Sequence, residues 1–356
     1  MARKTANATT AVTGRRRHAA AAAAEGKVTL EMVAAAAGVS PSTVSRILNG
    51  TAVVSDDKRA AVDEAVARLG FVPNPVARGL AGGRTLSIGV VTQAIDSPFY
   101  GGALRGIEEE LGRVGYSPLF VSGHWNAAHE ARCIDTLRSR RVDGLIVLDG
   151  RLGDAALSAV AQSLPVVVTG RALKAPALYA LHFDNFEGGR LATHHLLSLG
   201  HRRIAFITGD PRHADSKERQ RGYRAALEAA GLAFDPALVV PGNYTEDSGR
   251  MAVERLLDGR QAFTAIFAAN DQMAFGAALA LHRRRLHVPG DVSLVGFDDL
   301  QTAVYSIPPL STVHHPVYGL GQLAASAMLQ LLAGETPTAE LPAPRFIVRE
   351  STRSTL

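Results

Sequence analysis

Residues 28–83 read VTLEMVAAAAGVSPSTVSRILNGTAVVSDDKRAAVDEAVARLGFVPNPVARGLAGG, and this stretch decides how the chain is organised. Thr29 can cap a first short helix that carries its apolar residues along one face. Gly38 permits a tight turn, and Ser40 can cap a second helix that has Pro41 at its first position. Two short helices joined by a glycine-containing turn predict a helix-turn-helix.

The same stretch continues into a third helix and a connection. Ser55 is placed to cap the third helix, and Asp56 and Asp57 complement its dipole. Residues 74–83, which follow two prolines, could form one and a half helical turns that would be largely unfolded in isolation. A plain flexible linker is the alternative for this segment.

From Leu86 onward the pattern changes to short β-branched runs that alternate with amphipathic helical patterns. This alternation predicts parallel sheets covered by helices on both faces. It begins again after Asp184, so we expect two doubly wound α/β lobes of similar size. Ligands bind beyond the carboxyl ends of the strands in such sheets, and two facing lobes would form a cleft there.

Charge and composition narrow the function classes. Residues 1–84 carry twelve Lys and Arg against six Asp and Glu, whereas the rest of the chain carries 26 against 27. The positive charge therefore lies at the end that would contact DNA phosphates. We expect residues 1–27 to be a disordered basic arm. A single cysteine, Cys133, excludes an internal disulfide and fits a cytoplasmic protein, and no stretch approaches a membrane-spanning helix.

Several motifs along residues 28–350 together resemble the Lac-repressor family of transcriptional regulators. The resemblance begins with VTLEMVAAAAGVSPSTVSRILNG and GFVPNPVARGLAGGRTLSIGVV and continues through RVDGLIV, LGHRRIAFITG, FAANDQMAFGA, VGFDD and IPPLSTV. It implies a helix-turn-helix headpiece and a hinge helix, followed by a two-lobed core like that of periplasmic sugar receptors. The implied boundaries are 28–73 for the headpiece, 74–83 for the hinge helix, 84–184 with 315–341 for the N-terminal lobe, and 185–314 with 342–356 for the C-terminal lobe.

The resemblance also implies which residues meet DNA. In the family a leucine of the hinge helix wedges into the minor groove, and Leu80 stands at that position. Residues of the second helix face the major groove, where Arg46 could reach a guanine. The full set of expected DNA contacts is Thr29, Ser40, Pro41, Ser42, Thr43, Ser45, Arg46, Asn49, Asn74, Ala77 and Leu80.

An effector site is expected at the strand ends. Asp96 offers a hydrogen-bond acceptor, and Phe99 or Tyr100 a flat apolar face, a pairing that suits sugars. The resemblance adds five further positions to this site: Arg171, Arg219, Tyr244, Asn270 and Asp298. Family members often carry an acid directly before Arg171, where this chain has a glycine. From the residue pattern alone, Arg219 could instead pair with Glu218 on a surface helix.

These observations lead to one reading and leave two alternatives. We expect a DNA-binding regulator, a repressor of a sugar uptake or catabolism operon, that acts as a homodimer on a palindromic operator under the control of a sugar-like effector. A sugar receptor or transport component with the same core, and a cytoplasmic sugar enzyme, are the alternatives. Catalytic motifs are missing, so no enzyme activity and no cofactor are expected. The histidine pairs at 124/129, 194/195 and 314/315 lack a metal-ligand pattern and are expected at the surface.

Overall fold

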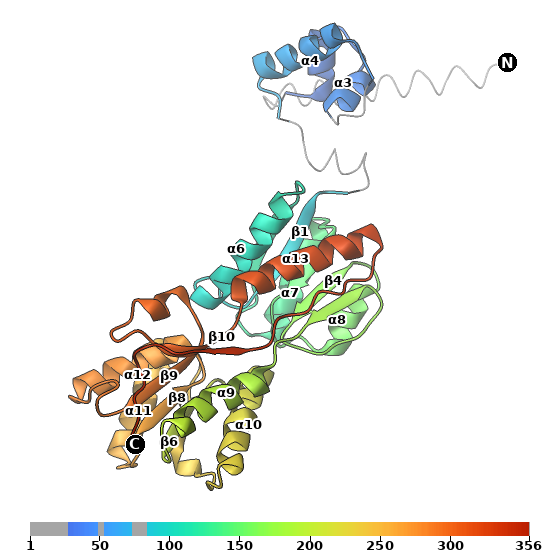
Figure 1. Ribbon diagram of the computed structural model, residues 1–356. Coiled ribbons are helices and arrows are strands. Elements are labelled where there is room, and N and C mark those ends of the chain that lie inside the picture. The colour runs from blue at the N-terminus through green and yellow to red at the C-terminus, as the bar shows by residue number, and fades with distance from the viewer. Residues whose placement is uncertain (1–27, 49–52, 73–83, 356) are drawn as a thin grey trace, which may run out of the picture. The chain divides into compact units, whose positions relative to one another are not determined.

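The chain divides into two compact units between Thr85 and Leu86 in a computed structural model that describes residues 28–48, 53–72 and 84–355 (Figure 1). The predicted basic arm, 1–27, and the predicted hinge helix, 74–83, lie outside the described residues.

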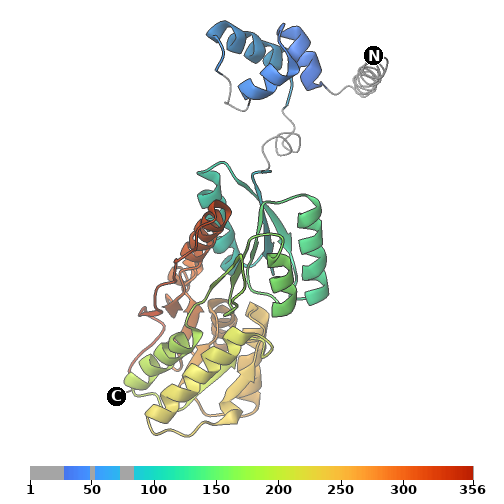
Figure 2. The same ribbon diagram turned by 90° about the vertical axis from the view of Figure 1, so that its right-hand side faces the viewer.

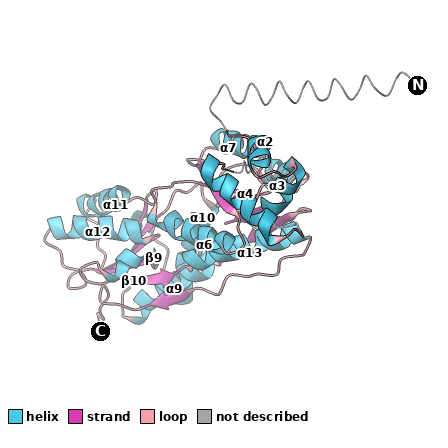
Figure 3. Ribbon diagram, turned by 90° about the horizontal axis from the view of Figure 1, so that it is seen from above, coloured by secondary structure: helices cyan, strands magenta, loops and turns pink. Residues whose placement is uncertain are grey.

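The described part of the first unit is entirely helical, with α2 (Leu30–Ala36), α3 (Pro41–Leu48) and α4 (Asp56–Leu69) (Figure 3). Thr29 Oγ1 accepts a hydrogen bond from the N–H of Met32, and Ser40 Oγ accepts one from the N–H of Thr43 at 3.2 Å. Gly38 has φ +66° in the turn between α2 and α3. The predicted helix-turn-helix is therefore confirmed.

One predicted cap is wrong. Ser55 occupies the N-cap position of α4, but its side chain makes no capping hydrogen bond. Its backbone carbonyl instead accepts the N–H groups of Lys58 and Arg59 at 3.1 and 3.2 Å, and Asp56 and Asp57 supply the negative charge that favours a helix start.

Six buried side chains hold the three helices together: Val33, Ala34, Val44, Ile47, Val62 and Ala65. Burying a large aliphatic side chain contributes about 1.5–3 kcal/mol. A core of this size is enough to fix the angle between α2 and α3, but it leaves the unit with little excess stability.

The second unit contains two lobes, and the N-terminal lobe is built on a parallel sheet of order β2-β1-β3-β4-β5. Its strands are β1 (Ser87–Thr92), β2 (Ser117–Ser122), β3 (Gly144–Val147), β4 (Val166–Thr169) and β5 (Leu178–Leu181). Helices α6 (Pro98–Gly112) and α13 (Val317–Ala333) cover one face, and α7 (Ala127–Ser139) and α8 (Asp154–Ala161) cover the other (Figure 2). The sequence pattern did not predict β5, which has only four residues.

Along β3 the side chains alternate between the two faces. Ile146 packs towards α6 and α13, whereas Leu145 and Val147 pack towards α7 and α8. Helices α6 and α13 touch through their backbones, because a Cβ on Gly106 would overlap the carbonyl of Tyr318.

The C-terminal lobe carries a sheet of order β11-β10-β9-β8-β6-β7, in which only β11 runs antiparallel to its neighbour among the described strands. The strands are β6 (Ile204–Thr208), β7 (Val239–Pro241), β8 (Ala265–Ala268), β9 (Ser293–Asp298), β10 (Ser311–His314) and β11 (Arg345–Ile347). Its helices are α9 (Asn185–Ser198), α10 (Ala214–Ala229), α11 (Glu246–Asp258) and α12 (Asp271–Arg283), with short 3-10 turns at Pro236–Leu238 and Gln301–Val304.

The chain passes between the lobes three times: after β5, after β10, and between α13 and β11 (Figure 1). The two predicted doubly wound lobes are confirmed, and the parallel strands of both point their carboxyl ends at the cleft between them. Within the described residues, no helix is both long and apolar enough to cross a membrane.

Candidate functional site

A cavity of about 470 Å³ lies between the lobes, at the carboxyl ends of their strands. This volume is within the usual range for a small-molecule site. The N-terminal lobe contributes Ala94, Asp96, Ser97, Pro98, Phe99, Tyr100, Trp125 and Asp149, and the C-terminal lobe contributes His213, Asp215, Arg219, Asn243, Tyr244, Thr245, Glu246, Asn270, Gln272 and Asp298. Six of the seven expected effector residues therefore line one cavity.

Asp149, which was not predicted from the sequence, is fixed by hydrogen bonds in the part of the cavity that the N-terminal lobe lines. It follows β3, and its carboxylate accepts hydrogen bonds from Tyr100 Oη at 2.9 Å and from Thr169 Oγ1 at 3.1 Å. Burial raises its pKa, although both hydrogen bonds oppose that change. An acid at the end of an apolar strand was the available signal for this residue.

Arg219 provides the positive charge in the C-terminal half. Its Nε donates to Asn185 Oδ1 at 2.8 Å, its Nη1 donates to the carbonyl of Ala269 and lies 3.6 Å from Asp298 Oδ1, and its guanidinium lies 3.6 Å from the centre of the Phe297 ring. The side chain is 4% exposed, so the alternative of a surface pair with Glu218 is wrong. Glu218 pairs with Arg221 instead.

Asp298 and Tyr244 both adopt a left-handed backbone conformation, with φ 107° and φ 71°. Such strain in non-glycine residues is concentrated at functional sites. Among the described residues, Asp298 Oδ1 and Tyr244 Oη have no hydrogen-bond partner. Asn270 supports this corner, because its Nδ2 donates to the Tyr244 carbonyl at 3.0 Å while its Oδ1 caps α12.

Most of the ionisable side chains that line the cavity are acids. Five of the lining residues are carboxylic acids, namely Asp96, Asp149, Asp215, Glu246 and Asp298, against one arginine. Burial raises the pKa of Asp215 to about 7, and the neighbouring Asp149 adds to the rise. Burial likewise raises the pKa of Asp298 to about 7, although Arg219 opposes the change. A site of this kind accepts hydrogen bonds from hydroxyl groups and repels anions.

Arg171 is the expected effector residue that the structure places elsewhere. Its guanidinium donates to the carbonyls of Leu152 and Gly150 at 2.8 Å and to Asp154 at 3.1 Å. It lines a neighbouring cavity of about 450 Å³, which shares Trp125, Asp149, His213 and Asp215 with the first cavity. Arg171 is thus engaged in holding the loop after β3.

The expectation that the histidine pairs lie at the surface is wrong for His315. Its ring is 6% exposed, stacks on Phe183 at 3.9 Å and lies 5.2 Å from the ring of Phe99. Burial lowers its pKa well below the usual value. No group of three or more potential metal ligands occurs in the described part of the chain.

Some of the residues expected to contact DNA have exposed side chains, and others are half-buried or already hydrogen-bonded within the headpiece. Pro41, Ser42 and Arg46 are exposed on α3, whereas Thr43 and Ser45 are half-buried. The hydroxyl groups of Thr29 and Ser40 act as helix caps, and Ser40 Oγ also lies 2.9 Å from Ser42 Oγ. Asn49, Asn74, Ala77 and Leu80 lie outside the described residues.

Two family models match the chain. Residues 29–74 match that of the bacterial regulatory proteins of the lacI family, and residues 193–352 match a periplasmic binding protein-like domain.

Curated proteins match over most of the chain. The transcriptional regulator CelR of Thermobifida fusca is 38% identical over 333 residues, which cover 91% of this chain and 98% of CelR. The transcriptional repressor PurR of Haemophilus influenzae is 32% identical over an alignment that covers 92% of this chain and 99% of PurR.

Solved structures match as well. A complex of CelR with cellobiose has 35% sequence identity and a TM-score of 0.68, and covers 91% of this chain and all of its own. The Lac repressor dimer bound to operator and the anti-inducer ONPF has 30% identity and a TM-score of 0.84, and covers 92% of this chain and all of its own.

Proposed function

The chain belongs to the LacI family of bacterial regulatory proteins, and from this premise we propose that it represses a sugar uptake or catabolism operon, with operator affinity set by a sugar-like effector in the inter-lobe cavity. It is a DNA-binding transcriptional regulator and not an enzyme. The observation that carries the proposal is the joining of a helix-turn-helix to a core whose strand ends enclose a polar cavity.

The DNA-binding half of the proposal depends on α3. Its buried Val44 and Ile47 fix it against α2 and α4, while Ser42 and Arg46 on its other side are exposed. A helix held in this way can enter a major groove and present those side chains to base edges. DNA lies in the cytoplasm of a bacterium, and we place the protein there.

The effector half depends on the chemistry of the cavity. Asp149, Asp298 and Asn270 accept or donate hydrogen bonds, and Phe99 and Tyr244 offer flat apolar faces, a combination that suits the hydroxyl groups and C–H faces of a sugar ring. The acidic lining favours a neutral sugar over a sugar phosphate or a sugar acid. The relative CelR has been solved with cellobiose, which is a neutral disaccharide.

We also propose a homodimer on a palindromic operator. The loop after the 3-10 turn at Gln301–Val304 exposes Tyr305 by 76% and Ile307 by 97% of their surfaces. Adjacent large apolar side chains at such exposure favour burial against a partner, and a second copy with two-fold symmetry buries the same patch twice.

Control of DNA affinity follows from linkage. An effector changes operator affinity only if it binds one conformation of the core more tightly than another. The cavity is lined by both lobes, so its ligand affinity depends on the angle between them, and the three connections between the lobes are where that angle can change.

The experiment selects operator sequences from a random DNA pool with the full-length protein and then titrates the selected operator in the presence of neutral sugars. We expect a palindrome whose affinity changes with at least one sugar. Asp298→Asn should retain operator affinity and lose the sugar response, whereas the distant Asp258→Asn, on an exposed ion pair, should behave as wild type. Failure to select any sequence would contradict the proposed DNA function. A sugar response retained by Asp298→Asn would show that the effector binds outside this cavity.

A further inference from the structure

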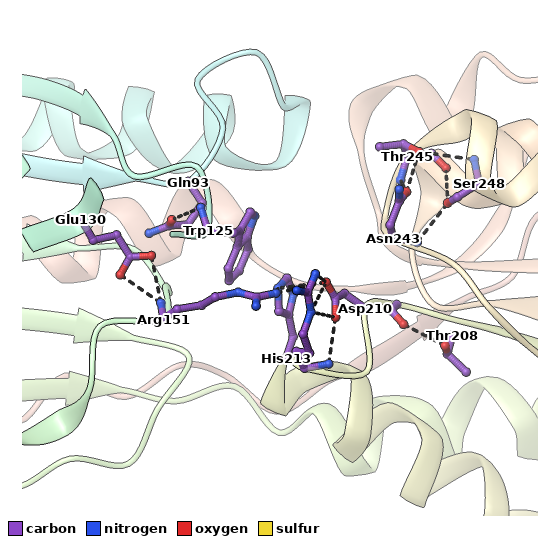
Figure 4. Close-up of polar contacts among 12 residues, drawn as sticks. Gln93, Trp125, Glu130, Arg151, Thr208, Asp210, His213, Asn243, Thr245 and Ser248 are labelled. Carbon is purple, nitrogen blue, oxygen red and sulfur yellow. Dashed lines mark hydrogen bonds and ion pairs between the residues drawn. The ribbon is translucent and has the colours of Figure 1, made fainter. Parts of the chain in front are cut away.

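Four side chains cross the mouth of the cleft and join the lobes (Figure 4). From the N-terminal lobe, the indole of Trp125 stacks on the ring of His213 with 3.7 Å between centroids and 22° between planes. Beside this stack, Arg151 Nη2 lies 3.1 Å from Asp210 Oδ2 and 3.3 Å from His213 Nε2. We call these four residues the cross-lobe latch.

The N-terminal half of the latch is held by two buried polar side chains. Gln93 Oε1 accepts the N–H of Trp125 at 2.9 Å, and the Glu130 carboxylate accepts the N–H of Arg151 at 2.9 and 3.0 Å and the N–H of Leu152 at 2.7 Å. Gln93 and Glu130 are 1% and 0% exposed. Trp125 itself has φ 53°, a left-handed conformation that a tryptophan keeps only where its surroundings hold it.

The C-terminal half is held just as firmly. Asp210 accepts hydrogen bonds from the backbone N–H of Arg212 at 2.9 Å and from its guanidinium, and these bonds keep the pKa of Asp210 far below its usual value. The N–H of His213 donates to the Asp210 carbonyl at 3.0 Å, and its ring lies over Tyr244 with 5.6 Å between centroids. Burial lowers the pKa of His213 to about 4, so the ring is neutral beside Arg151 near pH 7.

The position of the latch relates it to the effector. Trp125 and His213 line both the effector cavity and its neighbour, so their stack stands at the boundary of the two spaces. Arg151 and Asp210 do not line the effector cavity, which makes their ion pair separable from effector contacts. A ligand that passed from one space to the other would have to separate Trp125 from His213.

We propose that the cross-lobe latch keeps the effector cleft closed in the absence of effector, so that opening the cleft requires Trp125 to leave His213. This inference rests on the proposed function for its regulatory meaning: the resting state of the regulator is then a closed core, and effector exchange proceeds through an open state that the latch makes rare.

Trp125 is the only tryptophan of the chain, so its fluorescence reports on the latch without any ligand. The experiment measures acrylamide quenching of the full-length protein for wild type, Arg151→Met and Asp210→Asn. Arg151→Met keeps the backbone N–H bonds to Glu130 and removes the guanidinium. Loss of one such contact shifts a two-state population about 2- to 10-fold, so the quenching constant should rise in both variants towards that of His213→Ala.

Arg284→Met is the matched control, because Arg284 pairs with the exposed Asp258 within the C-terminal lobe and contacts none of the four latch residues. Its quenching constant should equal that of wild type, while circular dichroism verifies that every variant is folded. Unchanged quenching in both Arg151→Met and Asp210→Asn, or an equal rise in Arg284→Met, would overturn the latch. Operator titration of the wild type is run separately, and a failure there contradicts the proposed function without altering the fluorescence result.

Discussion

The carboxylate of Asp149 occupies the space that a side chain at Gly170 would need. A Cβ built at position 170 would overlap Asp149 Oδ1, and Gly170 has φ +67°, where side chains are strained. The family resemblance implies an acid at position 170, and in this chain an acid from the neighbouring strand end stands there instead. Gly170 does not itself line the proposed effector cavity, but the absence of a side chain there leaves room for Asp149, which does.

The first prediction follows from this relationship. Gly170→Ala should lower the free energy of unfolding by roughly 1–2 kcal/mol for the left-handed backbone alone, and should displace Asp149 and weaken the effector response. Urea denaturation measures the first effect and operator titration with effector the second. Gly101→Ala in α6 is the control, since a Cβ there meets nothing within 4 Å. Equal stabilities of the two variants would contradict the overlap.

The second prediction concerns base readout by α3. Arg46→Ala should lose about 1–3 kcal/mol of discrimination between operator and unrelated DNA, because an arginine can bond two acceptors of one guanine. Binding of effector by the core should be unchanged. Arg59→Ala, on the exposed side of α4, is a suitable comparison that removes the same charge from the same unit. If Arg46→Ala binds the selected operator as tightly as wild type, Arg46 does not read the sequence.

The third prediction concerns pH. The pKa of Asp215 is about 7 in the folded chain, mainly through burial, whereas an unfolded aspartate titrates near about 4. Between these two pH values the folded state holds a proton that the unfolded state has released, so the free energy of unfolding falls as pH rises. The stabilising effect of Asp215 is complete below about pH 4 and is lost as pH rises through about 7. Asp215→Asn should therefore gain stability relative to wild type as pH rises from about 4 to about 7, by at most about 1.4 kcal/mol per unit, and the difference should level off above that.

Urea denaturation at a series of pH values tests this. Asp135→Asn, whose carboxylate is 75% exposed on α7, should follow wild type throughout. A constant difference between Asp215→Asn and wild type across the series would show that the carboxyl does not titrate with folding.

The fourth prediction concerns assembly. Ile307→Asp should convert the proposed dimer to a monomer at micromolar concentration, because a charge at the exposed loop would be buried without a partner in that dimer. Light scattering with size-exclusion chromatography gives the mass directly. Glu335→Lys, at an exposed position that follows α13, changes charge elsewhere and should leave the mass unchanged. A dimer that persists in Ile307→Asp would place the interface on another surface.

The fifth prediction concerns Leu80, which lies outside the described residues. If two copies of this leucine enter one base step, Leu80→Ser should weaken operator binding strongly and should spare the salt-sensitive, nonspecific binding of the basic headpiece. A flexible pyrimidine–purine step at the centre of the operator should be preferred. The measurement compares wild type and variant on the palindrome and on a copy with its centre replaced, and four equal affinities would reduce residues 74–83 to a passive linker.

Local pattern predicted most of the fold, because cap residues and hydrophobic period act over a few neighbours. The N-cap role of Thr29 and the strand–helix alternation after Leu86 are of this kind. Strand β5 was missed because Leu178–Leu181 lacks the β-branched run that marks the equally short β4, and because no helix of its own lobe follows it.

The site was predicted less completely, for a related reason. Arg219 and Asp298 could be assigned to the site by family resemblance, but their mutual contact spans 79 residues and needs the packed lobe. The stack of Trp125 on His213 joins two lobes and has no local pattern at all. Arg171 looked equivalent to the others in sequence, yet nearby carbonyls hold its guanidinium away from the effector cavity.

Helix α13 has a consequence for how the protein is made. It covers the face of the N-terminal sheet that contains Ile88 and Ile146, yet it follows β6–β10 of the other lobe in the chain. A ribosome therefore releases the first sheet with only α6 on that face, and α13 completes the cover only after most of the second lobe has emerged. A contiguous fragment that ended before Val317 would present this apolar surface to water and to other nascent chains. Neither lobe is therefore encoded by one contiguous segment of the gene, and neither can be expressed whole as such a segment.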